Sequence, residues 1–174
     1  FTKDTTKTFK GCCCLKSLAE SGNHWKVIGK KLTGPGEGGK GWPKTSPDSG
    51  DGYIQGGGKD GRTGKPGKGT GGTVVTPTEG GGSVWQYHDK KGKLRDASNW
   101  RVLAHELCGH AFHMDKGTHW RDKPGHTGDR GDRPNHDQVI GEENGIAAEH
   151  GEPERGTWDD PKHGESGSRK GTPR

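Results

Sequence analysis

The chain has 174 residues, of which only 22% are hydrophobic and 35 are glycine, so it has room for one domain with a small core. Its formal net charge is +5, but the lysines and arginines are scattered among almost as many acidic residues, and no basic stripe indicates a nucleic-acid partner. No apolar run is long enough to span a membrane.

The first part of the chain, residues 1–82, is predicted to be a glycine-rich region with one or two short strands. Glycines and prolines are concentrated between positions 34 and 82, which indicates mostly loop there. The apolar and β-branched residues at 25–28 and 71–76 are typical of short strands, and residues 83–87 predict a further strand.

Two helices are predicted in the rest of the chain. N-cap candidates at residues 96–99 begin the first, which we expect over residues 97–114. Its apolar residues recur at helical spacing: Trp100, Leu103, Leu107 and Ala111. Pro134 and Asn135 begin the second helix, which we expect to end at Gly151.

The four cysteines form the run Cys12, Cys13 and Cys14 and the distant Cys108. This spacing matches no zinc knuckle and no common disulfide framework. Two interpretations stay open. One disulfide joins the run to Cys108, or all four are free thiols in a reducing cytosol before export, and we favour the second.

The first predicted helix carries a pattern typical of metal-binding helices, His105-Glu106-Leu107-Cys108-Gly109-His110. It is similar to the H-E-x-x-H motif of zinc peptidases but is one residue longer. In a regular helix, residues five apart differ by about 140° around the axis, so the two imidazoles would diverge. We therefore expect a π-type turn, eased by Gly109, that lets both histidines bind one Zn²⁺. The alternative is a structural zinc on His105 and Cys108.

Glu106 follows the first histidine directly and is predicted to be the general base of a hydrolysis, not a ligand. The expected function is a zinc-dependent metallopeptidase that acts on a peptide or protein substrate. Two rivals stay open: a non-catalytic zinc-stabilised binding or spike-tip module, and a zinc amidase that acts on cell-wall peptides. A structural site has no need of a carboxylate beside its first ligand, so Glu106 separates the first rival from an enzyme.

The third ligand is predicted to be Glu143, because its neighbours at helical spacing are all apolar. An ionised carboxylate in a core is costly unless it is paired or bound to a metal. His136 lies seven residues earlier on the same helix face and is the main alternative, and His119 is another. Glu142 is interpreted as a solvated surface charge.

The lengthened histidine motif, followed by the pair Glu142-Glu143, resembles the zinc site of the dipeptidyl peptidase III family. The resemblance implies that the second glutamate of the pair, Glu143, binds the metal. It covers only these motifs. The chains of that family are several times longer, so we expect neither their fold nor their dipeptide-releasing activity here.

A broader resemblance runs from about residue 84 to residue 166, carried by residues 99–107 and 143–153. These segments are similar to zincin-like effector domains at the C-termini of VgrG-type spikes and of Rhs and other polymorphic toxins of bacteria. We therefore expect an α+β, zincin-like fold with an active-site helix, a ligand helix, a small β-sheet and long glycine-rich loops. The catalytic domain is expected over 83–166, followed by a tail over 167–174, in one structural domain overall.

The same resemblance implies a toxic effector that is secreted, for example by type VI secretion, and delivered into target cells, with the periplasm as one destination. It also implies a parent spike or toxin chain and an immunity protein that neutralises the toxin. The start at Phe1 without a signal peptide fits a piece of such a longer protein.

Two further expectations concern the substrate. Residues 71–76 are expected to form the edge strand on which an extended peptide pairs, although an ordinary structural strand is the alternative. A tetrahedral oxyanion needs a hydrogen-bond donor, and four residues are candidates by residue type alone: Tyr87, His150, Arg155 and His163.

Overall fold

The computed structural model of the protein describes residues 9–32, 43–56, 62–78, 86–121 and 134–156. Its helices and strands, in chain order, are α1 (Lys10–Ala19), β1 (Trp25–Lys30), β2 (Lys44–Pro47), β3 (Gly72–Pro77), β4 (Gln86–His88), β5 (Leu94–Asp96), α2 (Asn99–Leu103), η1 (Ala104–Ala111), α3 (Phe112–Asp115) and α4 (Pro134–Glu149). The expected mixture of helices and strands, an α+β fold, is confirmed.

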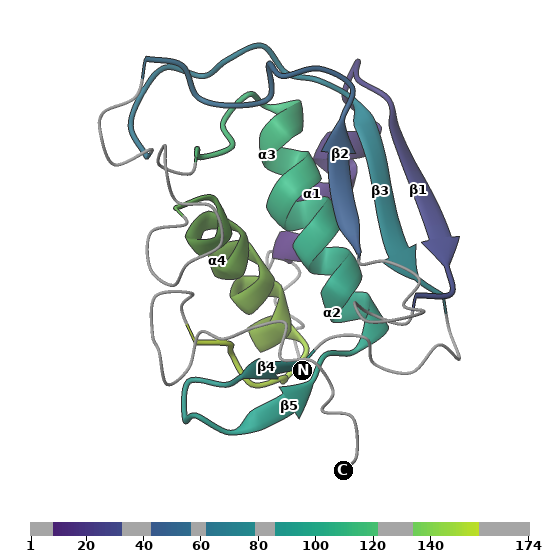
Figure 1. Ribbon diagram of the computed structural model, residues 1–174, viewed down its shortest axis with the longest axis vertical. Coiled ribbons are helices and arrows are strands. Elements are labelled where there is room, and N and C mark those ends of the chain that lie inside the picture. Colours follow the sequence, from purple (N-terminus) through teal and green to yellow (C-terminus); the bar gives the residue numbers. More distant parts are fainter. Residues whose placement is uncertain (1–8, 33–42, 57–61, 79–85, 122–133, 157–174) are drawn as a thin grey trace, which may run out of the picture.

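One long helix forms the centre of the molecule. Its segments α2, η1 and α3 follow each other without a break over residues 99–115 (Figure 1). The helix expected over residues 97–114 is therefore confirmed. Its middle segment, η1, is a π-helix, so the widening that the spacing of His105 and His110 demanded is also present.

A three-stranded sheet covers one side of the long helix (Figure 1). Its order is β1-β3-β2, with β3 parallel to β1 and antiparallel to β2. The expected strands at 25–28 and 71–76 are confirmed as β1 and β3. However, the expectation that 71–76 is an edge strand is wrong, because β3 is hydrogen-bonded on both sides. An added peptide would have to pair with β1 or β2.

Helix α4 packs against the other side of η1, and the hairpin β4-β5 lies near the start of the long helix (Figure 1). The second predicted helix is thus confirmed as α4. Of the strand predicted over 83–87, the structure describes only residues 86 and 87, which belong to β4. The tail expected at 167–174 lies outside the described residues.

Three elements were not expected: α1, β2 and β5. Helix α1 contains the cysteine run, and its first-turn glycine and short apolar stripe give little helical signal. Strand β2 has the sequence Lys-Thr-Ser-Pro, which carries no hydrophobic alternation. Pairing with β3, rather than its own propensity, makes β2 a strand.

Apolar contacts on both sides of η1 form the core. Val74 of β3 packs on Leu107 and Ala111, while Ile146 of α4 packs on the opposite side with the cystine. That cystine is Cys14–Cys108, so the interpretation of four free thiols is wrong for this pair. Cys12 and Cys13 are exposed free cysteines. None of the helices in the described residues is both long and apolar enough to cross a membrane.

Candidate metal centre

Three histidines meet where α4 crosses the long helix. One ring nitrogen from each of His105, His110 and His136 lies within 4.8 Å of the others. The ring centroids of His105 and His110 are 5.1 Å apart, and that of His136 lies 6.1 and 5.5 Å from them. Imidazole nitrogens grouped at this distance are the donors expected for a transition metal.

The π-helix brings the first two histidines together. With i to i+5 bonding, residues five apart come onto one face, so His105 and His110 both point toward α4. Gly109 permits the close crossing of the two helices, because a Cβ at this position would lie 2.3 Å from Cγ1 of Val139 in α4. The glycine expected to ease the π-turn therefore also lets α4, and with it His136, approach the long helix.

Glu143, the expected third ligand, lies behind His105 and not in this cluster. It is 1% exposed, and its Oε2 is 2.9 Å from Nδ1 of His105. Its Oε1 accepts a hydrogen bond of 2.5 Å from Nε of Arg101, and Arg155 is 3.4 Å from Oε2. The alternative weighed from the sequence, His136, lies in the third position of the cluster. Glu143 is thus a paired core carboxylate, since cations already surround it.

Electrostatics keep Glu143 ionised. Burial raises its pKa, but the hydrogen bond from His105 and the charges of Arg155, His105 and Arg101 outweigh burial and bring the pKa to about 2. An ionised carboxylate only accepts hydrogen bonds, so Nδ1 of His105 donates its hydrogen to Glu143, and Nε2 is the nitrogen left to bind a metal.

The other two histidines are held in a similar way through Nδ1. Nδ1 of His136 is 2.5 Å from the side-chain oxygen of Asn135. Nδ1 of His110 is 2.8 Å from Nε2 of His119, which is fully buried. Burial lowers the pKa of His110, and it lowers that of His119 to about 4. His119, weighed as a ligand, is not part of the three-histidine cluster; it lies at hydrogen-bond distance from His110 and lines the same cavity as the cluster.

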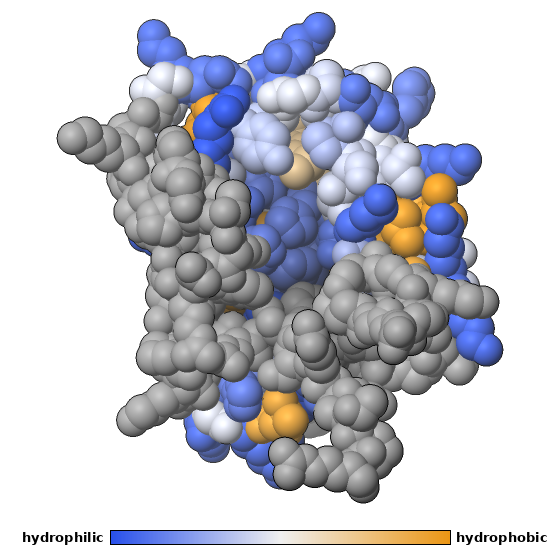
Figure 2. All heavy atoms as spheres, viewed as in Figure 1, coloured by the Kyte–Doolittle hydropathy of each residue, from blue (hydrophilic) through white to orange (hydrophobic). Residues whose placement is uncertain are grey.

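Glu106, the expected general base, is close to the three histidines. Glu106 and the three histidines line one cavity of about 270 Å³, together with residues of β2 and of the loop that follows β2. The hydroxyl of Thr45 in β2 lies 2.7 Å from Oε2 of Glu106 and 2.9 Å from its backbone oxygen. Burial raises the pKa of this carboxyl, while His105 and Thr45 oppose the shift. Figure 2, viewed from the same side as Figure 1, shows a hollow of hydrophilic side chains near the middle of the molecule.

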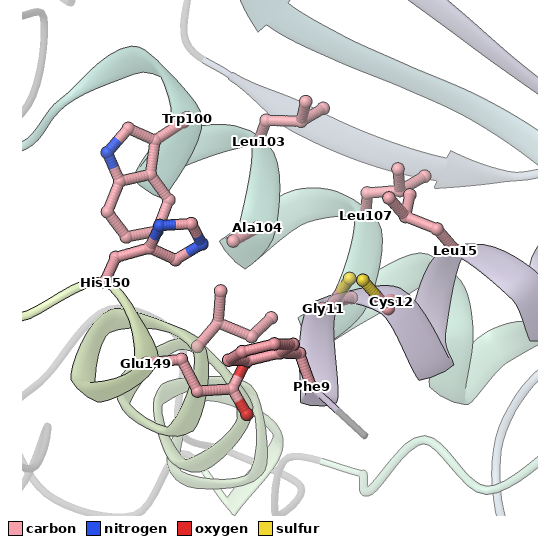
Figure 3. Close-up of a pocket in the computed structure, with 12 residues that line it drawn as sticks. Phe9, Gly11, Cys12, Leu15, Trp100, Leu103, Ala104, Leu107, Glu149 and His150 are labelled. Carbon is pink, nitrogen blue, oxygen red and sulfur yellow. The ribbon is translucent and has the colours of Figure 1, made fainter. Parts of the chain in front are cut away.

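Three of the residues considered as oxyanion donors are described by the structure, and none of the three lines this cavity. The hydroxyl of Tyr87 is 3.0 Å from Arg101, on the Glu143 side of His105, and Arg155 also contacts Glu143. His150 packs on Trp100 with 4.7 Å between ring centroids and lines a second, apolar cavity (Figure 3). His163 lies outside the described residues.

Cys108 and Glu142 were also given roles from the sequence. Cys108 is in a disulfide, so the alternative zinc site on His105 and Cys108 is wrong. Glu142 was predicted to be a solvated charge, but its side chain is only 33% exposed and lies 3.8 Å from both Lys10 and His113, so it is a partly exposed, paired carboxylate. Tyr53, which sequence reasoning missed, lines the cavity with Glu106, and its ring centroid is 5.2 Å from that of His119. No local motif marked this tyrosine.

Comparisons with known proteins add no family. No family model, curated protein or solved structure matches this chain. The resemblances to zincin-like toxin domains and to dipeptidyl peptidase III therefore rest only on the motif residues.

Proposed function

We propose that the chain is a zinc-dependent peptidase whose metal is held by His105, His110 and His136. The observation that carries this proposal is the π-helix, which turns two histidines toward a third and keeps Glu106 in the same cavity. A wide helical turn of this kind is rare and is frequently found at functional sites. The histidine spacing alone would otherwise give two diverging imidazoles.

The donor set fits zinc. Three imidazoles, each with Nδ1 at hydrogen-bond distance from a neighbouring side chain, leave three Nε2 atoms as possible metal donors. Nitrogens on a tetrahedral zinc at about 2.0–2.1 Å lie roughly 3.3 Å apart, so a group within 4.8 Å has to contract only modestly. Three protein ligands leave a fourth position for water or substrate, as catalytic zinc sites require.

The protein's own residues then supply the proton transfer. A zinc ion at this site would lower the pKa of a water molecule toward about 7 and polarise the scissile carbonyl. Thr45 donates a hydrogen bond to Oε2 of Glu106, which lines the cavity, so Oε1 is the oxygen left to accept a proton. Glu106 takes the proton of the attacking water on this oxygen and passes it to the leaving amine. Tyr53 is the candidate to stabilise the oxyanion, since it lines the cavity with Glu106.

The sheet offers a place for an extended substrate. Strand β2 pairs with β3 on one side, and among the described strands it forms an edge of the sheet. Lys44 and Thr45 of β2 line the cavity, so a peptide added to this edge would pass over Glu106. This arrangement supports a peptide or protein substrate and a zincin-like fold.

The biological setting is part of the same proposal. The Cys14–Cys108 disulfide suits an oxidising compartment, such as the periplasm of a target cell. Together with the motif resemblance, it supports a secreted toxin domain that is joined to a parent spike or toxin chain and is neutralised by an immunity protein.

The experiment is zinc analysis and peptide hydrolysis of the purified chain beside Glu106→Gln and Thr45→Val. We expect one zinc per chain in all three proteins. Activity should fall about 10²–10⁴-fold in Glu106→Gln and less in Thr45→Val, which removes only the group that orients the base. Cell-wall peptides assayed in parallel separate an amidase from a peptidase. A Glu106→Gln protein that keeps its zinc and wild-type activity would overturn the proposal.

A further inference from the structure

His119 links the second histidine of the cluster to the backbone. Its Nδ1 is 2.8 Å from the carbonyl oxygen of Trp120, and its Nε2 is 2.8 Å from Nδ1 of His110. The two rings are inclined by only 8°, with centroids 5.0 Å apart. Stacked rings keep their atoms about 3.5 Å apart, so the shorter nitrogen–nitrogen distance indicates an edge-to-edge hydrogen bond.

The positions of the hydrogens in this series of hydrogen bonds follow from the Trp120 carbonyl at its end. A carbonyl oxygen only accepts, so Nδ1 of His119 must carry a hydrogen. In the neutral ring Nε2 is then an acceptor, and it receives the hydrogen on Nδ1 of His110. His110 is thereby fixed as the tautomer whose Nε2 carries the lone pair. Nδ1 of His105 likewise donates its hydrogen to Glu143, although the group that accepts from His110 is uncharged.

The loop that carries His119 is itself fixed. The backbone N–H of His119 donates to Gly52, and its carbonyl accepts from Ile54, so this residue is clamped by the segment after β2. The preceding turn uses Gly117 at φ +66°, where a Cβ would lie 2.1 Å from the carbonyl oxygen of Gly67. The imidazole of His119 is therefore presented to His110 from a rigid position.

We propose that His119 is a positioning residue of the metal centre. Its imidazole donates a hydrogen bond to the Trp120 carbonyl and accepts one from Nδ1 of His110, so that Nε2 of His110 is the nitrogen that binds the metal. His119 is not itself a ligand, because both its nitrogens are engaged and a metal cannot lie on a 2.8 Å hydrogen bond. The inference rests on the proposed metal site but not on peptidase activity. It assigns a role to a buried histidine that lies outside the motif in the sequence.

The first test compares zinc affinity, by competition with a chelator, for wild type, His119→Phe and His119→Gln. Phenylalanine fills the space without an acceptor, so we expect affinity about 10–100-fold weaker. Glutamine offers an amide oxygen to His110 and should restore most of the loss. The matched control is His113→Phe. His113 lies on the same long helix as His110 and contacts Thr118, the residue before His119, but does not contact His110. Its removal therefore loosens the loop that carries His119 without changing the hydrogen bond to His110.

The second test uses the metal-free wild-type protein and does not depend on the variants folding. Long-range ¹H–¹⁵N spectra should show His110 and His119 both with hydrogen on Nδ1. An Nε2–H tautomer at either histidine would overturn the inference, and so would wild-type zinc affinity in His119→Phe. Loss of zinc in both His119→Phe and His119→Gln, with His136→Ala still binding, would make His119 a ligand instead. Zinc binding that follows the expected pattern without any peptidase activity would refute only the proposed function.

Discussion

Removal of the Cys14–Cys108 disulfide should destabilise the protein strongly. The two cysteines are 94 residues apart in the sequence. In the chain-entropy model, closing a loop of this size lowers the entropy of the unfolded chain, which raises the free energy of unfolding by about 4.7 kcal/mol at 25 °C. Measured losses for native disulfides are about 2–5 kcal/mol. Small domains have a free energy of unfolding of about 5–15 kcal/mol, so this one bond supplies a large share of it.

The perturbation is Cys14→Ala with Cys108→Ala, because alanine places no hydroxyl in the cluster with Ala104 and Ile146. The assay is urea unfolding at fixed pH, with the free energy extrapolated to water. The matched control is Cys12→Ser with Cys13→Ser. Both of these cysteines are exposed, so the control should stay within about 0.5 kcal/mol of wild type.

Two results would refute this reasoning. One is a loss of less than about 1 kcal/mol in the alanine pair, which would mean that the closed loop contributes little. The other is the titration of all four cysteines as thiols in the native, unreduced protein, where we expect only Cys12 and Cys13 to react. Since Cys108 lies in η1 between the two histidines, we also expect weaker zinc binding in the alanine pair.

Three further predictions concern the metal centre. His136→Ala removes a ligand and should weaken zinc binding more than 100-fold, whereas Glu143→Gln should weaken it about 10–100-fold. Glu143→Gln should also lower the free energy of unfolding by about 3–5 kcal/mol, because two buried arginines lose their counter-charge. Chelator competition measures the zinc affinities and melting curves measure the stability; the reverse order of affinities would restore Glu143 as the ligand. Gly109→Ala should cost about 1–3 kcal/mol by pushing α4 from the long helix, while Gly141→Ala, with open space around the new Cβ, should not destabilise in the same urea titration. Tyr53→Phe should lower kcat on the order of 10²-fold with unchanged zinc content, and an unchanged kcat would remove Tyr53 from the mechanism.

The sequence was most informative where one local pattern had a single geometric solution. Five-residue spacing between His105 and His110 on an apolar-periodic helix could join the two rings only through a π-turn, and η1 is such a turn. The two helices followed from their caps and periodicity in the same way. Strand β2 and its Thr45 were missed because the contact with Glu106 joins residues 61 apart and leaves no local signature.

The choice between Glu143 and His136 shows what the sequence could not decide. They are seven residues apart on α4; His136 lines the cavity and Glu143 is buried. Which of them faces the motif histidines depends on where α4 crosses η1, and that crossing is set by the contact of Gly109 with Val139. Apolar neighbours correctly indicated a buried carboxylate at Glu143, but such a group is either metal-bound or paired. Its partners could not be identified from the sequence, because no local pattern links Arg101 or Arg155 to Glu143.

The ion pairs of Glu143 give a physical reason why metal binding and folding should be coupled. This carboxylate joins α4 to α2 through Arg101, to the segment after α4 through Arg155, and to the metal centre through His105. Each of these side chains is at most 5% exposed, so every charge in the group depends on the others for compensation. A metal on Nε2 of His105 would strengthen the Nδ1–H bond to Glu143 and so reinforce the anchor of α4, the helix that presents His136. Zinc should therefore raise the melting temperature of wild type more than that of Glu143→Gln, and equal shifts would show that the two sites are not coupled.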